Sequence, residues 1–217
     1  LEALIGPFTP LELVVSTTAH RLMEIFFATN ALKKDTGVDV ASITARKIEK
    51  VGVLGAGLMG AGIAYVTIAA GVPVRMKDKD EAAAARGMKY VADVLDGRVK
   101  RRQITAIERT ETLALLTTAT DYSGLHGADL VIEAVFEDLD VKHKVLAEVE
   151  EHARPGAIFA SNTSSIPIAK IAARAKHPEN VIGMHYFSPV HKMPLLEVIR
   201  TKLTAPEVVA TAVAVGK

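Results

Sequence analysis

A histidine and a glutamate in two successive apolar segments are the residues of this sequence best suited to acid–base chemistry. His185 lies in the apolar run of residues 181–186, and Glu197 follows twelve residues later in the next apolar stretch. If the second stretch folds back beside the first, the carboxylate can orient the imidazole and stabilise its protonated form, as in general base catalysis. A single histidine in an apolar strand is more often a hydrogen-bonded core residue than a catalyst, so the pattern alone leaves both interpretations open.

A glycine-rich hexapeptide, G-A-G-L-M-G at residues 55–60, follows an apolar run directly and opens a helix-favouring segment. This context is typical of dinucleotide binding. Gly55 allows a tight turn, Gly57 lets a pyrophosphate approach the backbone, and Gly60 lets helix and strand pack closely. The unpaired N–H groups at the start of a helix attract phosphate. The alternative is that the glycines serve packing alone.

An acidic residue follows the hexapeptide at the distance that dinucleotide binding requires. Asp78 stands 23 residues after Gly55, at the end of the next apolar run. Its carboxylate can accept hydrogen bonds from an adenosine ribose and would repel a 2′-phosphate, which favours NAD over NADP. Lys77 and Lys79 flank it and weaken that preference.

Polar residues also follow two later apolar runs. Glu137 comes just after residues 129–134, and Lys142 lies in the first turn of the helix predicted next. Residues 161–165, Ser-Asn-Thr-Ser-Ser, stand between a strand and a helix. Ligands of parallel sheets bind beyond the carboxyl ends of strands, so these groups are candidates for a site. The alternatives are a solvated surface lysine and hydroxyls that cap a helix.

Continuous apolar runs alternate with helix-favouring segments along most of the chain. The runs predicted as strands are residues 51–54, 72–76, 115–118, 129–134, 157–161, 181–186 and 195–200. The segments predicted as helices are residues 58–70, 80–102, 141–152 and 166–175. This alternation predicts an α/β fold with a doubly wound, mostly parallel, Rossmann-type sheet.

The ends of the chain carry a different pattern. Thr9, Pro10 and Glu12 have the spacing of a helix start, and an apolar helical face continues to about Leu32. A polar linker follows. We therefore expect an N-terminal helix and linker over residues 1–49, a nucleotide-binding domain over residues 50–205, and the start of a truncated further domain over residues 206–217. The first residue is not Met, and both ends have the character of cuts in a longer protein.

Composition excludes several function classes. The chain has 217 residues, a formal net charge of +1 and no cysteine. Near-neutral charge gives no general attraction for nucleic acid or a membrane surface. Cysteine-ligated zinc sites and cysteine nucleophiles are ruled out, and no metal site is expected. No apolar run reaches the roughly 20 residues that span a bilayer.

Several of these stretches together resemble the L-3-hydroxyacyl-CoA dehydrogenases, and most of all the dehydrogenase part of the multifunctional fatty-acid β-oxidation protein. The matching stretches are residues 51–62, 128–138, 160–167 and 181–189, in family order. The resemblance covers about residues 50–217. It implies NAD-dependent oxidation of an L-3-hydroxyacyl-CoA to the 3-ketoacyl-CoA.

The resemblance also implies roles for individual residues. His185 matches the general base for the substrate 3-hydroxyl, Glu197 its carboxylate partner, and Ser164 a group that binds the substrate oxygen beside the nicotinamide. The positions implied to contact the cofactor are Gly55, Gly57, Met59, Gly60, Asp78, Glu137, Lys142, Ser164 and Ser188. Ser188 departs from shorter family members, which carry the longer asparagine side chain there.

The resemblance further implies partners outside this sequence. Residues 1–49 are similar, more weakly, to the connecting helix after an enoyl-CoA hydratase part, and in the family an all-helical domain follows the cofactor domain. We expect an acyl-CoA substrate, the rest of the same chain and a thiolase subunit as partners, in the bacterial cytoplasm or the mitochondrial matrix. Without the helical domain this segment is expected to bind NAD but to turn over poorly.

Two rival functions stay open at this point. One is a non-catalytic NAD-binding or assembly module. The other is a different dehydrogenase on the same fold, acting on 3-hydroxybutyryl-CoA or on a 2-hydroxy acid. The His185–Glu197 pair beside residues 161–165 argues against the 2-hydroxy acid.

Overall fold

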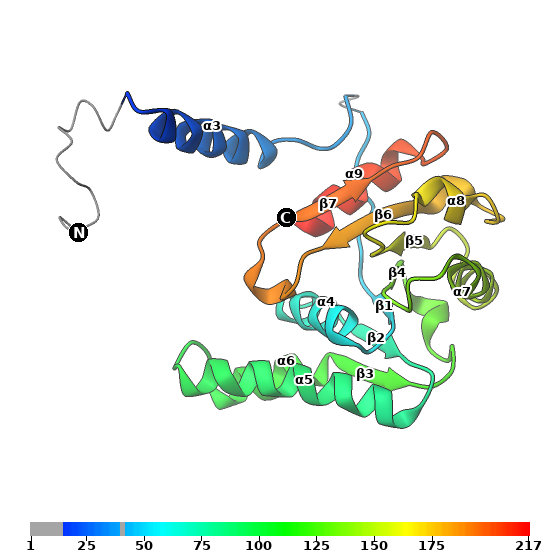
Figure 1. The fold of residues 1–217 in the computed structure, drawn as a ribbon. Helices are drawn as coiled ribbons and strands as arrows, with labels where there is room; N and C mark the ends of the chain where they lie inside the picture. The colour runs from blue at the N-terminus through cyan, green and yellow to red at the C-terminus, as the bar shows by residue number, and fades with distance from the viewer. Residues whose placement is uncertain (1–14, 40–41) are drawn as a thin grey trace.

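A seven-stranded sheet forms the centre of the molecule (Figure 1). The computed structural model describes residues 15–39 and 42–217. The strand order is β3-β2-β1-β4-β5-β6-β7, and every neighbouring pair is parallel except β6 and β7. The strands are β1 (Val51–Leu54), β2 (Val74–Lys77), β3 (Leu116–Ala119), β4 (Leu130–Glu133), β5 (Ile158–Ser161), β6 (Val181–Tyr186) and β7 (Leu196–Ile199). The predicted doubly wound α/β fold is confirmed.

Helices connect the parallel strands. The α-helices are α3 (Thr17–Leu32), α4 (Leu58–Ala69), α5 (Glu81–Lys100), α6 (Ala106–Ala114), α7 (Leu139–His152), α8 (Ile168–Ala172) and α9 (Pro206–Gly216). Short 3₁₀ turns η1 (Leu125–Gly127), η2 (Pro178–Asn180) and η3 (Val190–Lys192) complete the chain. Helix α6 was not predicted; a capping box between Thr105 and Glu108 starts it, although none of its residues is buried.

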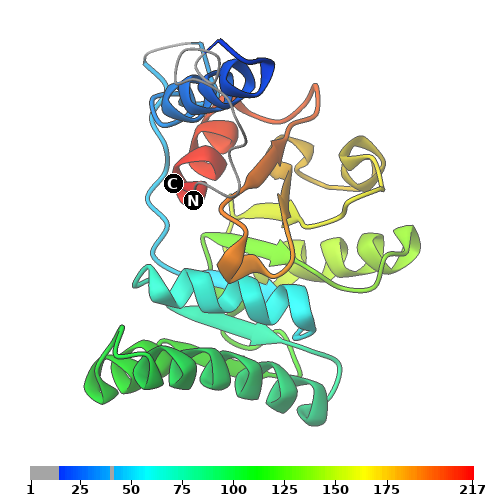
Figure 2. The same ribbon diagram turned by 60° about the vertical axis from the view of Figure 1, so that its left-hand side comes forward.

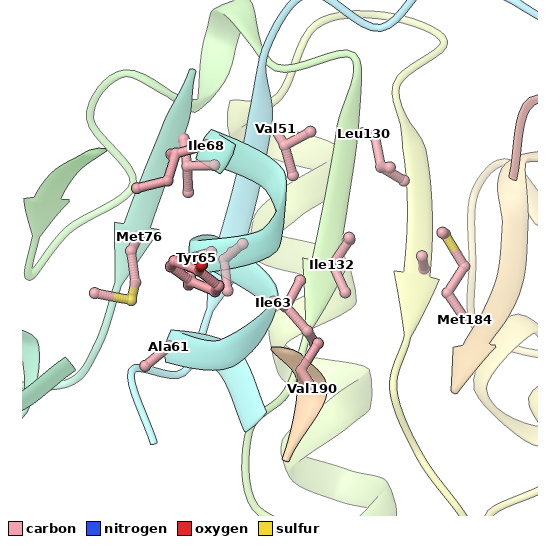
Figure 3. Close-up of a cluster of buried hydrophobic side chains, with 14 of the residues drawn as sticks. Val51, Ala61, Ile63, Tyr65, Ile68, Met76, Leu130, Ile132, Met184 and Val190 are labelled. Carbon is pink, nitrogen blue, oxygen red and sulfur yellow. The ribbon is translucent and has the colours of Figure 1, made fainter. Parts of the chain in front are cut away.

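Two hydrophobic clusters cover the two faces of the sheet. One contains α4, α5 and α9 with the apolar side chains of one face. The other contains η1, α7 and α8 on the opposite face. Figure 3 shows the first cluster, where Ile63 of α4 points toward Ile132 of β4 and Val190 of η3. Both faces are covered, which explains why the parallel strands read as continuous apolar runs.

The sheet register aligns the carboxyl ends of the strands at one rim. Leu54, the last residue of β1, pairs with Lys77 of β2 and with Glu133 of β4. Glu133 pairs in turn with Ser161, the last residue of β5. The order of strands reverses between β1 and β4, and such a switch point is where open parallel sheets bind ligands.

Helix α3, like α6, has no buried residue. Its predicted start at Thr9, Pro10 and Glu12 lies outside the described residues, and the described helix begins after Ser16, which caps it. Large apolar side chains on α3 are exposed, among them Leu22, Ile25, Phe26 and Phe27. The ribbon shows α3 lying apart from the sheet (Figure 1).

Helix α9 packs against β6 and β7, and its residues belong to the first hydrophobic cluster (Figure 2).

The predicted division of the chain into residues 1–49, 50–205 and 206–217 stays a prediction. Among the described residues, no helix is both long and apolar enough to cross a membrane.

Candidate active site

The glycine hexapeptide forms a tight turn from β1 into α4. Gly55 has a φ of +96°, a conformation that side chains rarely adopt. A Cβ on Gly60 would stand 1.8 Å from the carbonyl oxygen of Gly55, so only glycine allows this approach. A Cβ on Gly57 would meet nothing within 4 Å, and Gly57 is exposed. The backbone at Gly57 therefore faces open space at the start of α4, where a pyrophosphate can approach.

Asp78 lies beside this turn, at the end of β2. One carboxylate oxygen accepts a hydrogen bond from the Ala56 N–H at 2.6 Å, and the other accepts one from the Lys79 N–H at 2.6 Å. The carboxylate thus closes the glycine turn as well as standing at the predicted ribose position. Met59, also predicted to contact the cofactor, lies half-buried in the first turn of α4.

The predicted histidine–glutamate pair is formed across β6 and β7. The two strands run antiparallel, and their register places His185 opposite Glu197. His185 Nδ1 lies 2.8 Å from Glu197 Oε2. The imidazole is 18% exposed and the glutamate side chain 54% exposed, so the histidine is accessible at the rim. With its Nδ1 held, the other ring nitrogen is available to exchange a proton with a ligand.

The polar loop after β5 is tied to β6 and to the loop after β4. Asn162 Oδ1 accepts a hydrogen bond from the Tyr186 N–H at 2.8 Å, which fixes the backbone next to His185. Thr163 and Ser165 both donate hydroxyl hydrogen bonds to Glu137 Oε1. Ser164 stands between these two residues and is exposed. Ser188 is exposed as well, two residues beyond the end of β6.

A buried ion pair lies behind this loop. Lys142 Nζ is 2.7 Å from Glu133 Oε1 and 3.1 Å from Glu137 Oε2. The side chains of Lys142 and Glu133 are 1% and 0% exposed, whereas that of Glu137 is 40% exposed. Glu133 also accepts hydrogen bonds from the Ser161 hydroxyl at 2.7 Å and the Val135 N–H at 2.9 Å. The alternative of a solvated surface lysine at 142 is therefore wrong.

The environment of Glu137 favours its ionised form. Burial by itself would raise the pKa of Glu137, but hydrogen bonds from Thr163 and Lys142, with the charge of Lys142, lower the pKa below its ordinary value of 4.5. The rim therefore presents an ionised carboxylate, that of Glu137, at the loop that carries Ser164. Nearby, burial raises the pKa of Tyr186 to about 12.

The structure brings together most of the residues singled out from the sequence. The glycine turn, Asp78, the loop of Ser164 and the His185–Glu197 pair all lie at one rim of the sheet. The described residues contain no group of three or more acidic or histidine side chains that could hold a metal ion.

The sequence placed Ser161, Asn162 and Thr163 in a candidate loop but gave none of them a role of its own, and it gave Glu133 no role in supporting this rim. One signal was available: Glu133 is a charged residue within the apolar run of residues 129–134, where an unpaired carboxylate would be costly.

Comparison with known proteins identifies the family. Residues 50–217 match the family described as 3-hydroxyacyl-CoA dehydrogenase, NAD binding domain. The chain belongs to the 3-hydroxyacyl-CoA dehydrogenase family. The α subunit of the fatty acid oxidation complex from Shewanella frigidimarina is 52% identical over 206 residues, which cover 94% of this chain and 29% of that protein. The chain thus spans about three-tenths of the length of this curated relative.

Solved structures agree with this assignment. (S)-3-hydroxybutyryl-CoA dehydrogenase from Ralstonia eutropha is similar with a TM-score of 0.76 and 39% identity, over 78% of this chain and 60% of that one. The dehydrogenase part of multifunctional enzyme 1 from C. elegans gives a TM-score of 0.72 at 27% identity, over 84% of this chain and 42% of that one. The cofactor of this family domain is NAD. The open backbone at Gly57 and the carboxylate of Asp78 fit that dinucleotide.

Proposed function

We propose that this chain is the cofactor-binding part of an enzyme that oxidises L-3-hydroxyacyl-CoA to 3-ketoacyl-CoA with NAD, in fatty-acid β-oxidation. The observation that carries the proposal is the 2.8 Å contact between His185 Nδ1 and Glu197 Oε2 at the rim that also holds the glycine turn. A base held by a carboxylate beside a dinucleotide site is what alcohol oxidation requires.

Each residue at the rim has a proposed task. His185 takes the proton from the substrate 3-hydroxyl, and Glu197 keeps the ring oriented and balances the charge that the ring gains. Ser164, exposed on the loop after β5, donates a hydrogen bond to the substrate oxygen. NAD, when bound, supplies the hydride acceptor.

The cofactor side of the site has its own set of proposed contacts. The turn of Gly55, Gly57 and Gly60 receives the pyrophosphate, and Asp78 receives the adenosine ribose. Met59, Glu137, Ser164 and Ser188 are proposed to line the bound dinucleotide. Lys142 is proposed to act on the cofactor only through Glu137, since its ammonium group is enclosed by two carboxylates.

The remainder of the site comes from protein outside this segment. We propose that the other parts of a longer chain, a hydratase part and a C-terminal helical domain, complete the acyl-CoA site, with a thiolase subunit as partner. By this proposal the segment alone binds NAD and turns over poorly. The α subunit reported above is bacterial, which favours the bacterial cytoplasm as the location.

A matched pair of histidine variants tests the proposal. In the natural full-length protein, His185→Gln should reduce the reduction of acetoacetyl-CoA by NADH about 10²–10⁴-fold while leaving NADH binding nearly intact. His177→Gln is the control, because His177 also contacts a glutamate, Glu179 at 3.2 Å, but it precedes β6 and so lies toward the other rim, at the amino ends of the parallel strands. Near-normal turnover in His185→Gln would remove His185 from the role of base.

The same assay separates the rival functions. A wild-type protein that binds NADH but reduces no 3-ketoacyl-CoA would be an NAD-binding module. A series of acyl chain lengths separates a preference for 3-hydroxybutyryl-CoA from one for longer substrates.

A further inference from the structure

Two buried charged residues at the rim have no proposed contact with the substrate or the cofactor. Glu133 and Lys142 form an ion pair with almost no solvent exposure. Burying two charges costs free energy that their attraction often fails to repay, so such a pair does not by itself stabilise a protein. Its place at the carboxyl ends of β4 and β5 suggests a role in the site.

The hydrogen bonds around Glu133 match those that a carboxylate accepts. Three groups donate to it: the Lys142 ammonium group, the Ser161 hydroxyl and the Val135 N–H. An ionised carboxylate only accepts hydrogen bonds, and all three neighbours are donors. Glu133 is therefore fully satisfied as an anion.

The charges of the cluster do not cancel. Lys142 is one cation in contact with two carboxylates, Glu133 and Glu137. With both carboxylates ionised, the cluster carries one unit of net negative charge. Glu133 and Lys142 are almost fully buried, so Glu137, whose side chain is 40% exposed, is the member that presents this charge at the rim.

The position of Glu137 relates this charge to one part of the cofactor. A Rossmann-type sheet binds a dinucleotide with one nucleotide over each half, and Asp78 marks the half of β1, β2 and β3 as the adenosine side. Glu137 follows β4, and its hydroxyl donors Thr163 and Ser165 follow β5. Glu137 therefore lies on the half left for the nicotinamide.

We propose that Glu133 and Lys142 are positioning residues that hold Glu137 on the nicotinamide half with a surplus negative charge, and that this charge favours the oxidised cofactor. The nicotinamide ring carries a positive charge in NAD⁺ and none in NADH. A fixed carboxylate on that half attracts only the oxidised ring, and therefore lowers the dissociation constant of NAD⁺ relative to that of NADH. The inference rests on the NAD binding assigned above.

The ratio of the two dissociation constants, Kd(NAD⁺)/Kd(NADH), is the readout that tests this. Local loosening weakens both forms of the cofactor alike, whereas a change of charge acts on one form. In the natural full-length protein, Glu133→Gln leaves Lys142 with Glu137 as its only counter-charge and cancels the surplus. We expect the ratio to rise about threefold to tenfold, measured by calorimetric titration of each form.

Two control variants disturb the same cluster without changing its charge. Glu133→Asp keeps the carboxylate on a shorter side chain, and Ser161→Ala removes one hydrogen bond to Glu133. We expect both to keep the wild-type ratio, even where they weaken the binding of both forms. If Glu133→Gln does not fold, Glu137→Gln takes its place, because it removes the exposed carboxylate and with it the net negative charge of the cluster. This variant should raise the ratio in the same way.

The outcomes separate this inference from the NAD assignment. A wild-type protein that binds neither form contradicts the assignment itself. Normal binding by the wild type with an unchanged ratio in Glu133→Gln, or in Glu137→Gln, overturns the inference alone. So does a ratio that Ser161→Ala raises as much as Glu133→Gln.

Discussion

His185 and Glu197 face each other across the antiparallel pair of β6 and β7, with His185 Nδ1 2.8 Å from Glu197 Oε2. β7 is the one strand of the described sheet that runs against its neighbour. The contact is therefore set by the register of two adjacent strands and does not depend on a loop. A pair held in this way keeps its geometry before any ligand arrives.

Glu197→Gln tests what the carboxylate contributes. The variant keeps an oxygen near Nδ1 but removes the charge that balances a protonated ring. We expect turnover to fall about tenfold to a hundredfold, as for the loss of roughly 1.5–3 kcal/mol from a charged hydrogen bond. Steady-state assay with acetoacetyl-CoA and NADH measures it. Glu179→Gln, which alters the pair with His177, is the control, and equal activity of the two variants would contradict the role of Glu197.

Replacing two glycines of the same turn by alanine should have different effects: one variant should lose stability and the other affinity for NADH. Gly60→Ala would place Cβ 1.8 Å from a backbone oxygen, so we expect a loss of about 3 kcal/mol or more in the free energy of unfolding. Gly57→Ala meets no atom within 4 Å and should unfold like the wild type, yet bind NADH roughly tenfold or more weakly. Urea unfolding and NADH fluorescence titration measure the two effects. Normal NADH affinity in Gly57→Ala would show that the pyrophosphate lies elsewhere.

Asp78 should control the choice between NADH and NADPH. Asp78→Asn keeps an acceptor for the Ala56 N–H but removes the charge that repels a 2′-phosphate. We expect the preference for NADH to shrink about tenfold, equivalent to roughly 1.4 kcal/mol of charge repulsion. Comparing kcat/KM for the two cofactors measures it. Asp80→Asn alters the neighbouring acid, which caps α5, and should leave the preference unchanged.

Asn162 should affect catalysis through the backbone of β6. Its side-chain oxygen accepts the N–H of Tyr186, the residue after the proposed base. Asn162→Ala removes this acceptor, and we expect kcat to fall roughly tenfold because the imidazole is less well placed. Asn162→Asp keeps the acceptor oxygen and should retain most of kcat. If both variants lose kcat equally, the hydrogen bond to Tyr186 is not the cause.

The lowered pKa of Glu137 predicts a pH dependence of stability without cofactor. Its pKa in the folded chain lies below the ordinary 4.5, so folding favours the ionised form. This contribution is present above pH 4.5 and is lost as the pH falls through the lower folded value. The stability difference between wild type and Glu137→Gln should therefore shrink in acid. Urea unfolding of both proteins from roughly pH 3 to 7 measures it, and a constant difference would contradict the assignment.

The buried parallel sheet was largely predictable from the sequence, because strands covered on both faces must be apolar along their length. The predictions for β1 and β6 coincide with the observed residues 51–54 and 181–186, and the bounds of the other strands differ by at most two residues at either end. Helix α6 was missed because it buries no residue and so shows no apolar face. Helix α8 is shorter than predicted, at residues 168–172 rather than 166–175.

The support behind the site was not predictable from spacing. Glu133, Lys142 and Ser161 come from three separate segments: the register of β4 and β5 places Glu133 beside Ser161, and the packing of α7 on β4 adds Lys142. A lysine in the first turn of a helix ordinarily extends into solvent. Its burial here depends on two carboxylates that a linear sequence does not show to be near.

The switch point between β1 and β4 also has a consequence for biosynthesis. These two strands are neighbours in the sheet, yet α4, β2, α5, α6, β3 and η1 all lie between them in the sequence. Bringing them together closes a long loop, which is slow compared with forming a local hairpin. During translation the glycine turn therefore leaves the ribosome well before its neighbour β4 exists. Gly55 packs against the backbone of Ala134, the residue after β4, so the turn reaches its final packing only after that much more of the domain has been synthesised.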